Sequence, residues 1–200
     1  MTRERLQVLL EIALAVALTA VLHVITIYQA PQGGRISLEM LPIFVIAFRR
    51  GLGAGVLTGL LASPFIYLLE PFFVHPLQWV LDYPLAFALV GTAGLFRPLW
   101  LRFWNASRGG ADKAALTKGL ALAVTPGVLL GGLLRFGSHV LSGVLFIQLF
   151  APQIVESGQN VLLYSVIYNG TYMLPATLVS LVAMWILAPA LERVVPAKTG

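Results

Sequence analysis

The chain has 200 residues, a formal net charge of +5 and no cysteine; 58% of its residues are hydrophobic and only 10% are charged. Soluble domains contain about 25% charged residues, so this composition indicates a membrane protein, and the length suits one domain of about six helices. Without cysteine the chain has no disulfides, no thiol catalysis and no thiolate metal sites.

Six apolar segments follow one another along the chain. They lie at about 6–29, 37–49, 52–70, 77–96, 117–150 and 162–188. The first is too long for the ~7–15-residue core of a signal peptide, so we expect a retained helix. The pattern predicts an all-α membrane protein, 1–200 forming a single integral membrane domain built as a six-transmembrane-helix bundle.

Two of these segments have unusual lengths. Segment 37–49 contains Pro42 and, at ~1.5 Å per residue, spans about 20 Å, less than a ~30 Å hydrocarbon core. We therefore expect it to sit where its neighbours thin the membrane, or to begin partway down. Segment 117–150 is interrupted by Pro126-Gly127 and Gly131-Gly132, so it should be tilted, kinked or extended beyond the bilayer.

The basic residues set the expected orientation. If all six segments cross, 11 of the 13 Lys and Arg residues fall on one side, in the two termini and in the links after the second and fourth segments. Arg35 lies on the other side and Arg135 within a segment. The positive-inside rule makes the first side, with both termini, cytoplasmic. The basic isoelectric point of about 9.9 thus follows from topology rather than from nucleic-acid binding.

Ionisable side chains in a membrane helix cost about 2.5–3.5 kcal/mol each and call for a reason. Asp82, about two turns into the fourth segment, suggests a ligand carboxylate or a structural ion pair, with Arg135 as its possible counter-ion. His139 shares a helix face with Arg135, four residues away, and with Ser142. We predict ligand contact for His139 and mainly a structural role for Arg135.

The sixth segment opens with a row of tyrosines, Tyr164, Tyr168 and Tyr172, and a buried amide, Asn169. An interfacial aromatic belt or an amide that joins helices would explain some of them. Because Asp82, His139, Tyr164 and Asn169 all fall in the outer halves of three segments, we predict one pocket open to the outside.

Other charged residues near segment ends receive weaker assignments. Glu39 begins the short second segment, where a pocket, a gate or the membrane interface would each suit it. Glu11, His23 and Glu70 lie close enough to segment ends for their side chains to reach water, and we assign them no role.

The motifs that are missing narrow the function class. The chain has no Gly-x-x-x-x-Gly-Lys-Ser/Thr loop, His-Glu-x-x-His or Gly-x-Ser-x-Gly, and its three histidines are scattered. We therefore expect no enzyme, no metal site and no cofactor in this chain, and a binding or transport role with partners that supply energy. Ala13 and Ala17 on the first segment have the spacing that lets helices approach closely, within the bundle or in a partner.

Four stretches together resemble a known family: 31–51 (PQGGRISLEMLPIFVIAFRRG), 75–96 (HPLQWVLDYPLAFALVGTAGLF), 133–146 (LLRFGSHVLSGVLF) and 164–175 (YSVIYNGTYMLP). The chain resembles the thiamine-specific substrate-binding (S) component of energy-coupling factor (ECF) transporters, the YuaJ-type family of proton-coupled thiamine transporters. The match spans nearly the whole chain in order.

The resemblance implies high-affinity thiamine capture and uptake across a bacterial plasma membrane by a six-helix bundle. It implies three partner subunits: a membrane scaffold (T) component, contacted by Ala13 and Ala17, and two cytoplasmic ATPases that use ATP. The family's ligand-binding positions fall on Asp82, Tyr83, His139, Tyr164 and Asn169 of this sequence. An autonomous proton-coupled importer using Asp82 and His139 stays open as the alternative, and so does a structural subunit without a ligand.

The chain departs from the family at the positions that stack on the ligand. Some members have a tryptophan where this chain has Ile147, and another in the third helix, where Ala62 and Ser63 stand here. The aromatic partner is therefore unassigned, and Trp79, Tyr83, Phe146 and Tyr168 are its candidates.

Overall fold

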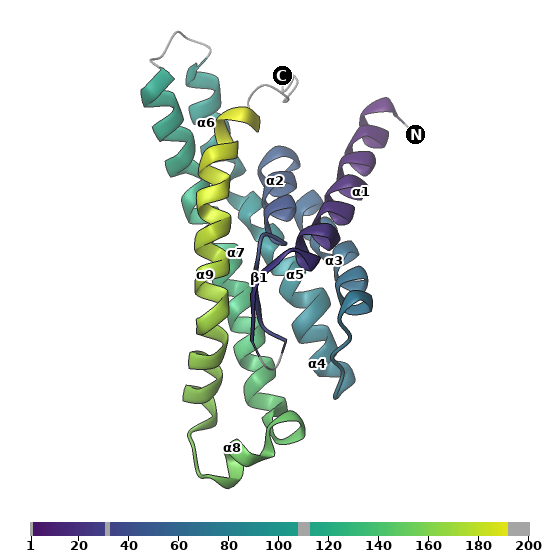
Figure 1. The fold of residues 1–200 in the computed structure, drawn as a ribbon. Helices are drawn as coiled ribbons and strands as arrows, with labels where there is room; N and C mark the ends of the chain where they lie inside the picture. Colours follow the sequence, from purple (N-terminus) through teal and green to yellow (C-terminus); the bar gives the residue numbers. More distant parts are fainter. Residues whose placement is uncertain (1, 31–32, 108–112, 192–200) are drawn as a thin grey trace.

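The structure, a computed structural model, describes residues 2–30, 33–107 and 113–191 (Figure 1). Helices dominate these residues. Five are long and apolar enough to cross a membrane: Arg3–Val24, Leu52–Leu69, Pro76–Asn105, Thr117–Phe150 and Val161–Leu191. The fold is thus that of a multi-pass membrane protein, and the short second segment is absent from this set.

The first segment does not stay helical to residue 29, as its hydropathy had predicted. Helix α1 (Arg3–Val24) ends before two antiparallel strands, β1 (Thr26–Gln29) and β2 (Arg35–Ser37), so the all-α prediction was wrong here. The β-branched residues Thr26 and Ile27 favour an extended chain. Gly33, with φ of +86°, supplies a backbone conformation that other residues rarely adopt.

The second segment forms a short helix, α2 (Leu41–Arg50), that begins four residues later than expected. Pro42 lies in its first turn, where a missing N–H has no helical partner to lose. Most of the helix is buried, including Phe44 and Phe48, which have no exposed surface. A helix of about 15 Å is tolerated here because protein rather than lipid surrounds it.

Helix α3 (Leu52–Leu69) leads by a loop to a continuous but irregular helical span. Its parts are α4 (Pro76–Val80), the wide π-helical turn η1 (Leu81–Leu85), α5 (Ala86–Val90), the tighter 3₁₀ turn η2 (Gly91–Phe96) and α6 (Arg97–Ser107). The fourth segment therefore continues past residue 96 into what had been taken as a link. Gly91 lets this span lie directly against α3, since a Cβ at Gly91 would lie 2.2 Å from the backbone nitrogen of Val56.

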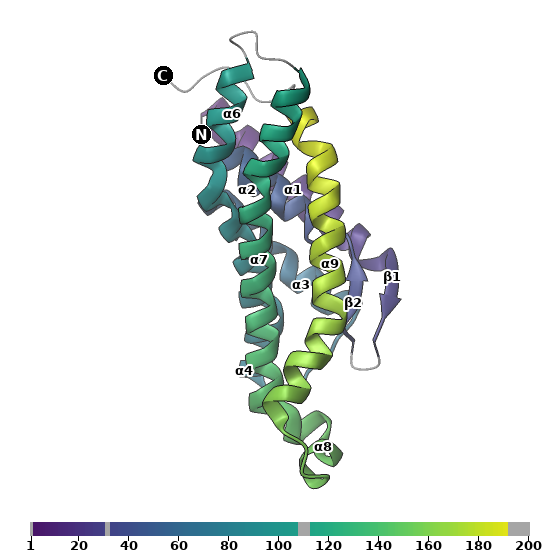
Figure 2. The same cartoon turned by 90° about the vertical axis from the view of Figure 1, so that its left-hand side faces the viewer.

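Two long helices complete the chain. Helix α7 (Lys113–Phe150) stays unbroken through Pro126 over 38 residues, about 57 Å, well beyond a ~30 Å hydrocarbon core. The short α8 (Pro152–Glu156) connects it to α9 (Val161–Leu191). Figure 2 shows α7 and α9 side by side along most of their length, an arrangement that brings residues from both helices to one wall.

Helix α1 begins and α9 ends at the same end of the molecule, which also holds the α2–α3 link and the tips of α6 and α7 (Figure 1). At this end Glu11 accepts hydrogen bonds from Arg49 and Arg50, 2.7–2.9 Å away, and joins α1 to the last turn of α2. Glu11 thus has a structural role that its sequence position did not suggest. Strand β1 runs from the end of α1 toward the opposite end, where α8 lies (Figure 2).

Candidate ligand-binding cavity

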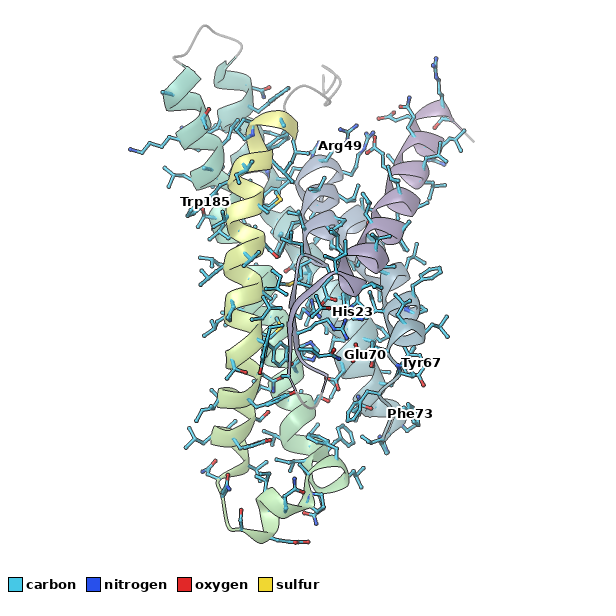
Figure 3. The ribbon with its side chains drawn as sticks, viewed as in Figure 1. His23, Arg49, Tyr67, Glu70, Phe73 and Trp185 are labelled. Carbon is cyan, nitrogen blue, oxygen red and sulfur yellow. The ribbon has the colours of Figure 1, made fainter. Side chains whose placement is uncertain are left out.

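A cavity of about 310 Å³ lies between the hairpin, the loop after α3, the π-helical turn η1, and helices α7 and α9. All five residues picked out as the binding set line it: Asp82, Tyr83, His139, Tyr164 and Asn169. Glu39, Arg135 and Tyr168 line it as well. Figure 3 shows His23 and Glu70 in the same middle region of the molecule.

Asp82 lies on the π-helical turn η1, two residues before Pro84. Proline has no N–H to donate, and widened turns of this kind often occur at functional sites. The Asp82 carboxylate accepts hydrogen bonds from Gln78 Nε2 at 2.7 Å and from Ser142 Oγ at 2.9 Å. Four-residue spacing puts Gln78 on the same helix face as Asp82, and this spacing was a signal that the sequence carried.

His139 stands between Asp82 and Arg135. Its Nδ1 lies 3.0 Å from Asp82 Oδ1, and Arg135 Nε donates to its Nε2 over 3.4 Å. Because a guanidinium can only donate, Nε2 must accept, and the ring proton is on Nδ1, directed at Asp82. The contact to Asp82 is then a hydrogen bond from the ring to the carboxylate.

Arg135, considered above as a possible counter-ion of Asp82, pairs instead with Glu39. Its Nη2 donates to Glu39 Oε1 at 2.5 Å, and its guanidinium lies 4.2 Å above the Phe87 ring. Glu39 is 3% exposed and also contacts His23 Nδ1 through its second oxygen. Glu39 thus bridges α1 and α7 from the start of α2, which neither the gate nor the membrane-interface interpretation had captured.

The rim of the cavity holds a second ion pair. Arg35 on β2 pairs with Glu70, which also accepts from Gln29 and lies 3.8 Å from His23 Nε2. Burial lowers the pKa of the Arg35 guanidinium, but arginine stays protonated in proteins. His23 and Glu70 both line the cavity. His23 is buried, so the prediction that its side chain reaches water was wrong, whereas the Glu70 side chain is 34% exposed.

The predicted tyrosine row forms one side of the cavity. The rings of Tyr164 and Tyr168 stack 6.1 Å apart and within 8° of parallel, and Tyr168 meets Tyr172 edge-on at 5.7 Å. Asn169 is buried and its amide is engaged: Nδ2 donates to the Ser165 carbonyl at 2.9 Å, and Oδ1 accepts from Tyr172 at 2.5 Å. Within the described residues the Tyr164 hydroxyl makes no hydrogen bond.

Two of the proposed stacking residues lie away from the cavity. Trp79 packs edge-on against Tyr67 at 6.0 Å, and Phe146 stacks on His75 at 5.0 Å; neither lines the cavity. Tyr83 does line it, and its hydroxyl holds the preceding loop by donating to the Glu70 carbonyl at 3.1 Å.

The hairpin covers one face of the cavity closely. The Gly34 N–H donates to the Tyr168 hydroxyl at 3.4 Å, and a Cβ at Gly34 would lie 2.3 Å from the Tyr172 ring. Glycine is therefore required for the hairpin to lie against the tyrosine row. Among the described residues, no group of three or more His, Asp or Glu side chains is placed to hold a metal ion.

On α1, Ala13 and Ala17 face outward, whereas Ala15 and Thr19 are buried inside the protein. Large apolar residues are also exposed along this helix, among them Leu10, Leu14 and Val21. The outward face is therefore available to lipid or to another helix.

Comparison with known proteins gives concordant results. The family model described as Thiamine transporter protein (Thia_YuaJ) matches residues 9–196. Two relatives named Thiamine transporter ThiT are similar over most of their length. The protein of Bacillus subtilis is 38% identical, over 90% of this chain and 88% of the relative. The protein of Lacticaseibacillus paracasei is 32% identical, over 98% of this chain and 94% of the relative.

A solved structure of ThiT from Listeria monocytogenes resembles this fold with a TM-score of 0.80 at 30% identity, covering 95% of this chain and 99% of that one. The relatives are named as transporters, not as enzymes. A family match over nearly the whole chain, with relatives above 30% identity, decides the assignment: this chain belongs to the thiamine transporter protein family.

Proposed function

We propose that this chain captures thiamine and mediates its uptake across the bacterial plasma membrane, as the substrate-binding subunit of an ECF-type transporter. Membership of the thiamine transporter family supports the substrate. The cavity adds a physical reason, because a carboxylate within it is not paired with an arginine.

Asp82 is the observation that carries the proposal. Three carboxylates line the cavity within the described residues, and two of them, Glu39 and Glu70, pair with Arg135 and Arg35. Among the described residues, Asp82 is hydrogen-bonded to Gln78, Ser142 and His139, and to no arginine or lysine. Thiamine carries one positive charge on its thiazolium ring and a hydrogen-bonding aminopyrimidine, so one unneutralised carboxylate complements it.

The remaining contacts follow from the same cavity. The Tyr164 hydroxyl has hydrogen-bonding capacity to offer a ligand, and the stacked rings of Tyr164 and Tyr168 present aromatic surface for the flat rings of thiamine. A cation against an aromatic face gains about 0.5–2 kcal/mol. We assign Asp82, Tyr83, His139, Tyr164 and Asn169 to the binding site, with Tyr168 in place of Trp79 or Phe146 as the stacking candidate.

Titration of the purified protein with thiamine tests the proposal directly. Binding should change the fluorescence of tryptophan or appear as heat in calorimetry, with one site per chain. Loss of the signal with oxythiamine, which has a carbonyl in place of the amino group, would support recognition of the aminopyrimidine. Absence of any saturable thiamine signal from folded protein would refute the function.

For orientation and partners we propose six crossings, counting α2, with both termini in the cytoplasm. Arg3 begins α1, Lys118 lies near the start of α7, and Figure 3 shows Arg49 toward the same end of the molecule. The positive-inside rule requires such basic residues at a cytoplasmic face. The outward face at Ala13 and Ala17 would contact the membrane scaffold component, and two ATPases would hydrolyse ATP.

Reconstitution in liposomes separates this proposal from the autonomous proton-coupled alternative. The chain alone should bind thiamine without accumulating it, and accumulation should require the scaffold, the ATPases and ATP. Uptake by the chain alone, driven by a pH gradient, would support the alternative instead.

A further inference from the structure

The pair of Glu39 and Arg135 stands out among the charged contacts of the cavity because both side chains are almost fully buried. Glu39 is 3% exposed and Arg135 is 6% exposed, with 2.5 Å between Oε1 and Nη2. Both nonetheless line the cavity, so Arg135 is a cation that a ligand would otherwise meet. A buried ion pair is often no more stabilising than apolar side chains of similar volume, so we looked for a role of this pair in ligand binding.

Arg135 is restrained from several sides. Its Nη2 is held by Glu39, its Nε by His139 Nε2 at 3.4 Å, and its plane lies over the Phe87 ring. Glu39 is itself held by His23 Nδ1 on α1. If Glu39 lost its charge, Arg135 would keep a buried positive charge without a partner, and the next carboxylate along the chain of contacts is Asp82, on the far side of His139.

We propose that Glu39 is a specificity-determining residue: by holding Arg135, it keeps the surplus charge of the cavity negative and located at Asp82. Among the described residues that line the cavity, three carboxylates face two guanidiniums, so these five groups carry one negative charge in excess. This inference rests on the proposed thiamine function. It assigns the preference for the singly charged vitamin over its phosphate esters to a residue outside the expected binding set.

The sign of the effect follows from the charges. A phosphate group carries about −1.5 to −2 at neutral pH and binds guanidinium groups strongly. Neutralising Glu39 removes the negative excess and frees Arg135 to pair with Asp82 or with a phosphate. Thiamine binding should therefore weaken, while binding of thiamine monophosphate should weaken less or strengthen. A purely structural role for Glu39 would weaken both ligands by the same factor.

The experiment measures dissociation constants of thiamine and thiamine monophosphate for purified parent protein and Glu39→Gln. The ratio of the two constants should shift toward the monophosphate by tenfold or more. The double variant Glu39→Gln/Arg135→Gln removes the freed cation and restores the surplus of one negative charge, so its ratio should return to within about threefold of the parent.

Glu70→Gln is the matched control. It also deprives an arginine of its carboxylate, but the Glu70 side chain is 34% exposed, and Arg35 keeps hydrogen bonds to the His23 carbonyl and Thr26 Oγ1. Its ratio should move by less than threefold, because water and these acceptors stabilise the released charge. An equal shift in Glu70→Gln would overturn the assignment to Glu39.

The measurements distinguish a failure of the proposed thiamine function from a failure of the role proposed for Glu39. If the parent does not bind thiamine, the proposed function fails; if the parent binds and Glu39→Gln leaves the ratio unchanged, only this inference fails. Should Glu39→Gln not fold, Glu39→Asp serves instead. Its shorter side chain keeps the charge but cannot reach both Arg135 and His23, so a shift of at least threefold in the same direction is expected and its absence overturns the inference.

Discussion

Replacing Asp82 by asparagine removes the charge of the proposed ligand carboxylate and keeps nearly the same side-chain shape. Asp82 is held by Gln78 and Ser142 at 2.7 and 2.9 Å and by His139 at 3.0 Å. These neighbours donate, and an amide presents an NH₂ group to at least one of them. The substitution therefore removes the charge and disturbs the position of the remaining oxygen.

The expected loss follows from the energy of a charged hydrogen bond. Such a bond contributes about 1.5–3 kcal/mol, and about 1.4 kcal/mol corresponds to a factor of ten in affinity. Asp82→Asn should therefore raise the dissociation constant for thiamine by about 10-fold to about 150-fold. Isothermal titration calorimetry of detergent-purified protein measures the change, with size-exclusion chromatography and thermal melting to confirm folding.

Ser142→Ala is the graded control for this prediction. It leaves the Asp82 charge in place and removes one neutral donor, which is worth about 0.5–1.5 kcal/mol. Its effect on affinity should be no more than about tenfold and smaller than that of Asp82→Asn. Folded Asp82→Asn that binds thiamine as tightly as the parent would refute the role of the carboxylate.

Three further predictions concern other parts of the molecule. Ala17→Trp enlarges the outward face of α1, so ATP-driven uptake with the partner subunits should fall by tenfold or more while thiamine affinity of the isolated chain stays within about twofold. Glu11→Gln removes the ion pairs that join α1 to the last turn of α2. The midpoint temperature of thermal unfolding should therefore fall by a few degrees, and the affinity for thiamine should not change. Gly34→Val places side-chain atoms against the Tyr172 ring, 2.3 Å from an added Cβ, so the hairpin should shift and calorimetry should show at least tenfold weaker thiamine binding. Unchanged uptake, an unchanged midpoint or unchanged affinity, respectively, would contradict them.

Hydropathy alone was informative about the long helices. Their continuous apolar stretches are long enough to span a bilayer, and this property resides in the local sequence. That Asp82, His139, Tyr164 and Asn169 line one cavity was also predictable. Polar side chains at similar depths of several membrane helices are costly in lipid, so they face the interior of the bundle.

The ends of elements and the partners of charged groups were decided by tertiary contacts. The predicted first segment ran to residue 29, yet Thr26–Gln29 pairs with Arg35–Ser37, and the hairpin packs on the tyrosine row. Hydropathy does not register such pairing.

The same holds for the charges. That Arg135 needs a counter-ion could be inferred from its place in an apolar segment, since a lone cation is costly in a membrane helix. That Glu39, 96 residues away, is this counter-ion became visible with the packing of the helices, and Asp82 meets no arginine among the described residues. The physical reason is that helix periodicity specifies which side chains share a face, whereas the packing of α2 between α1 and α7 specifies which faces meet.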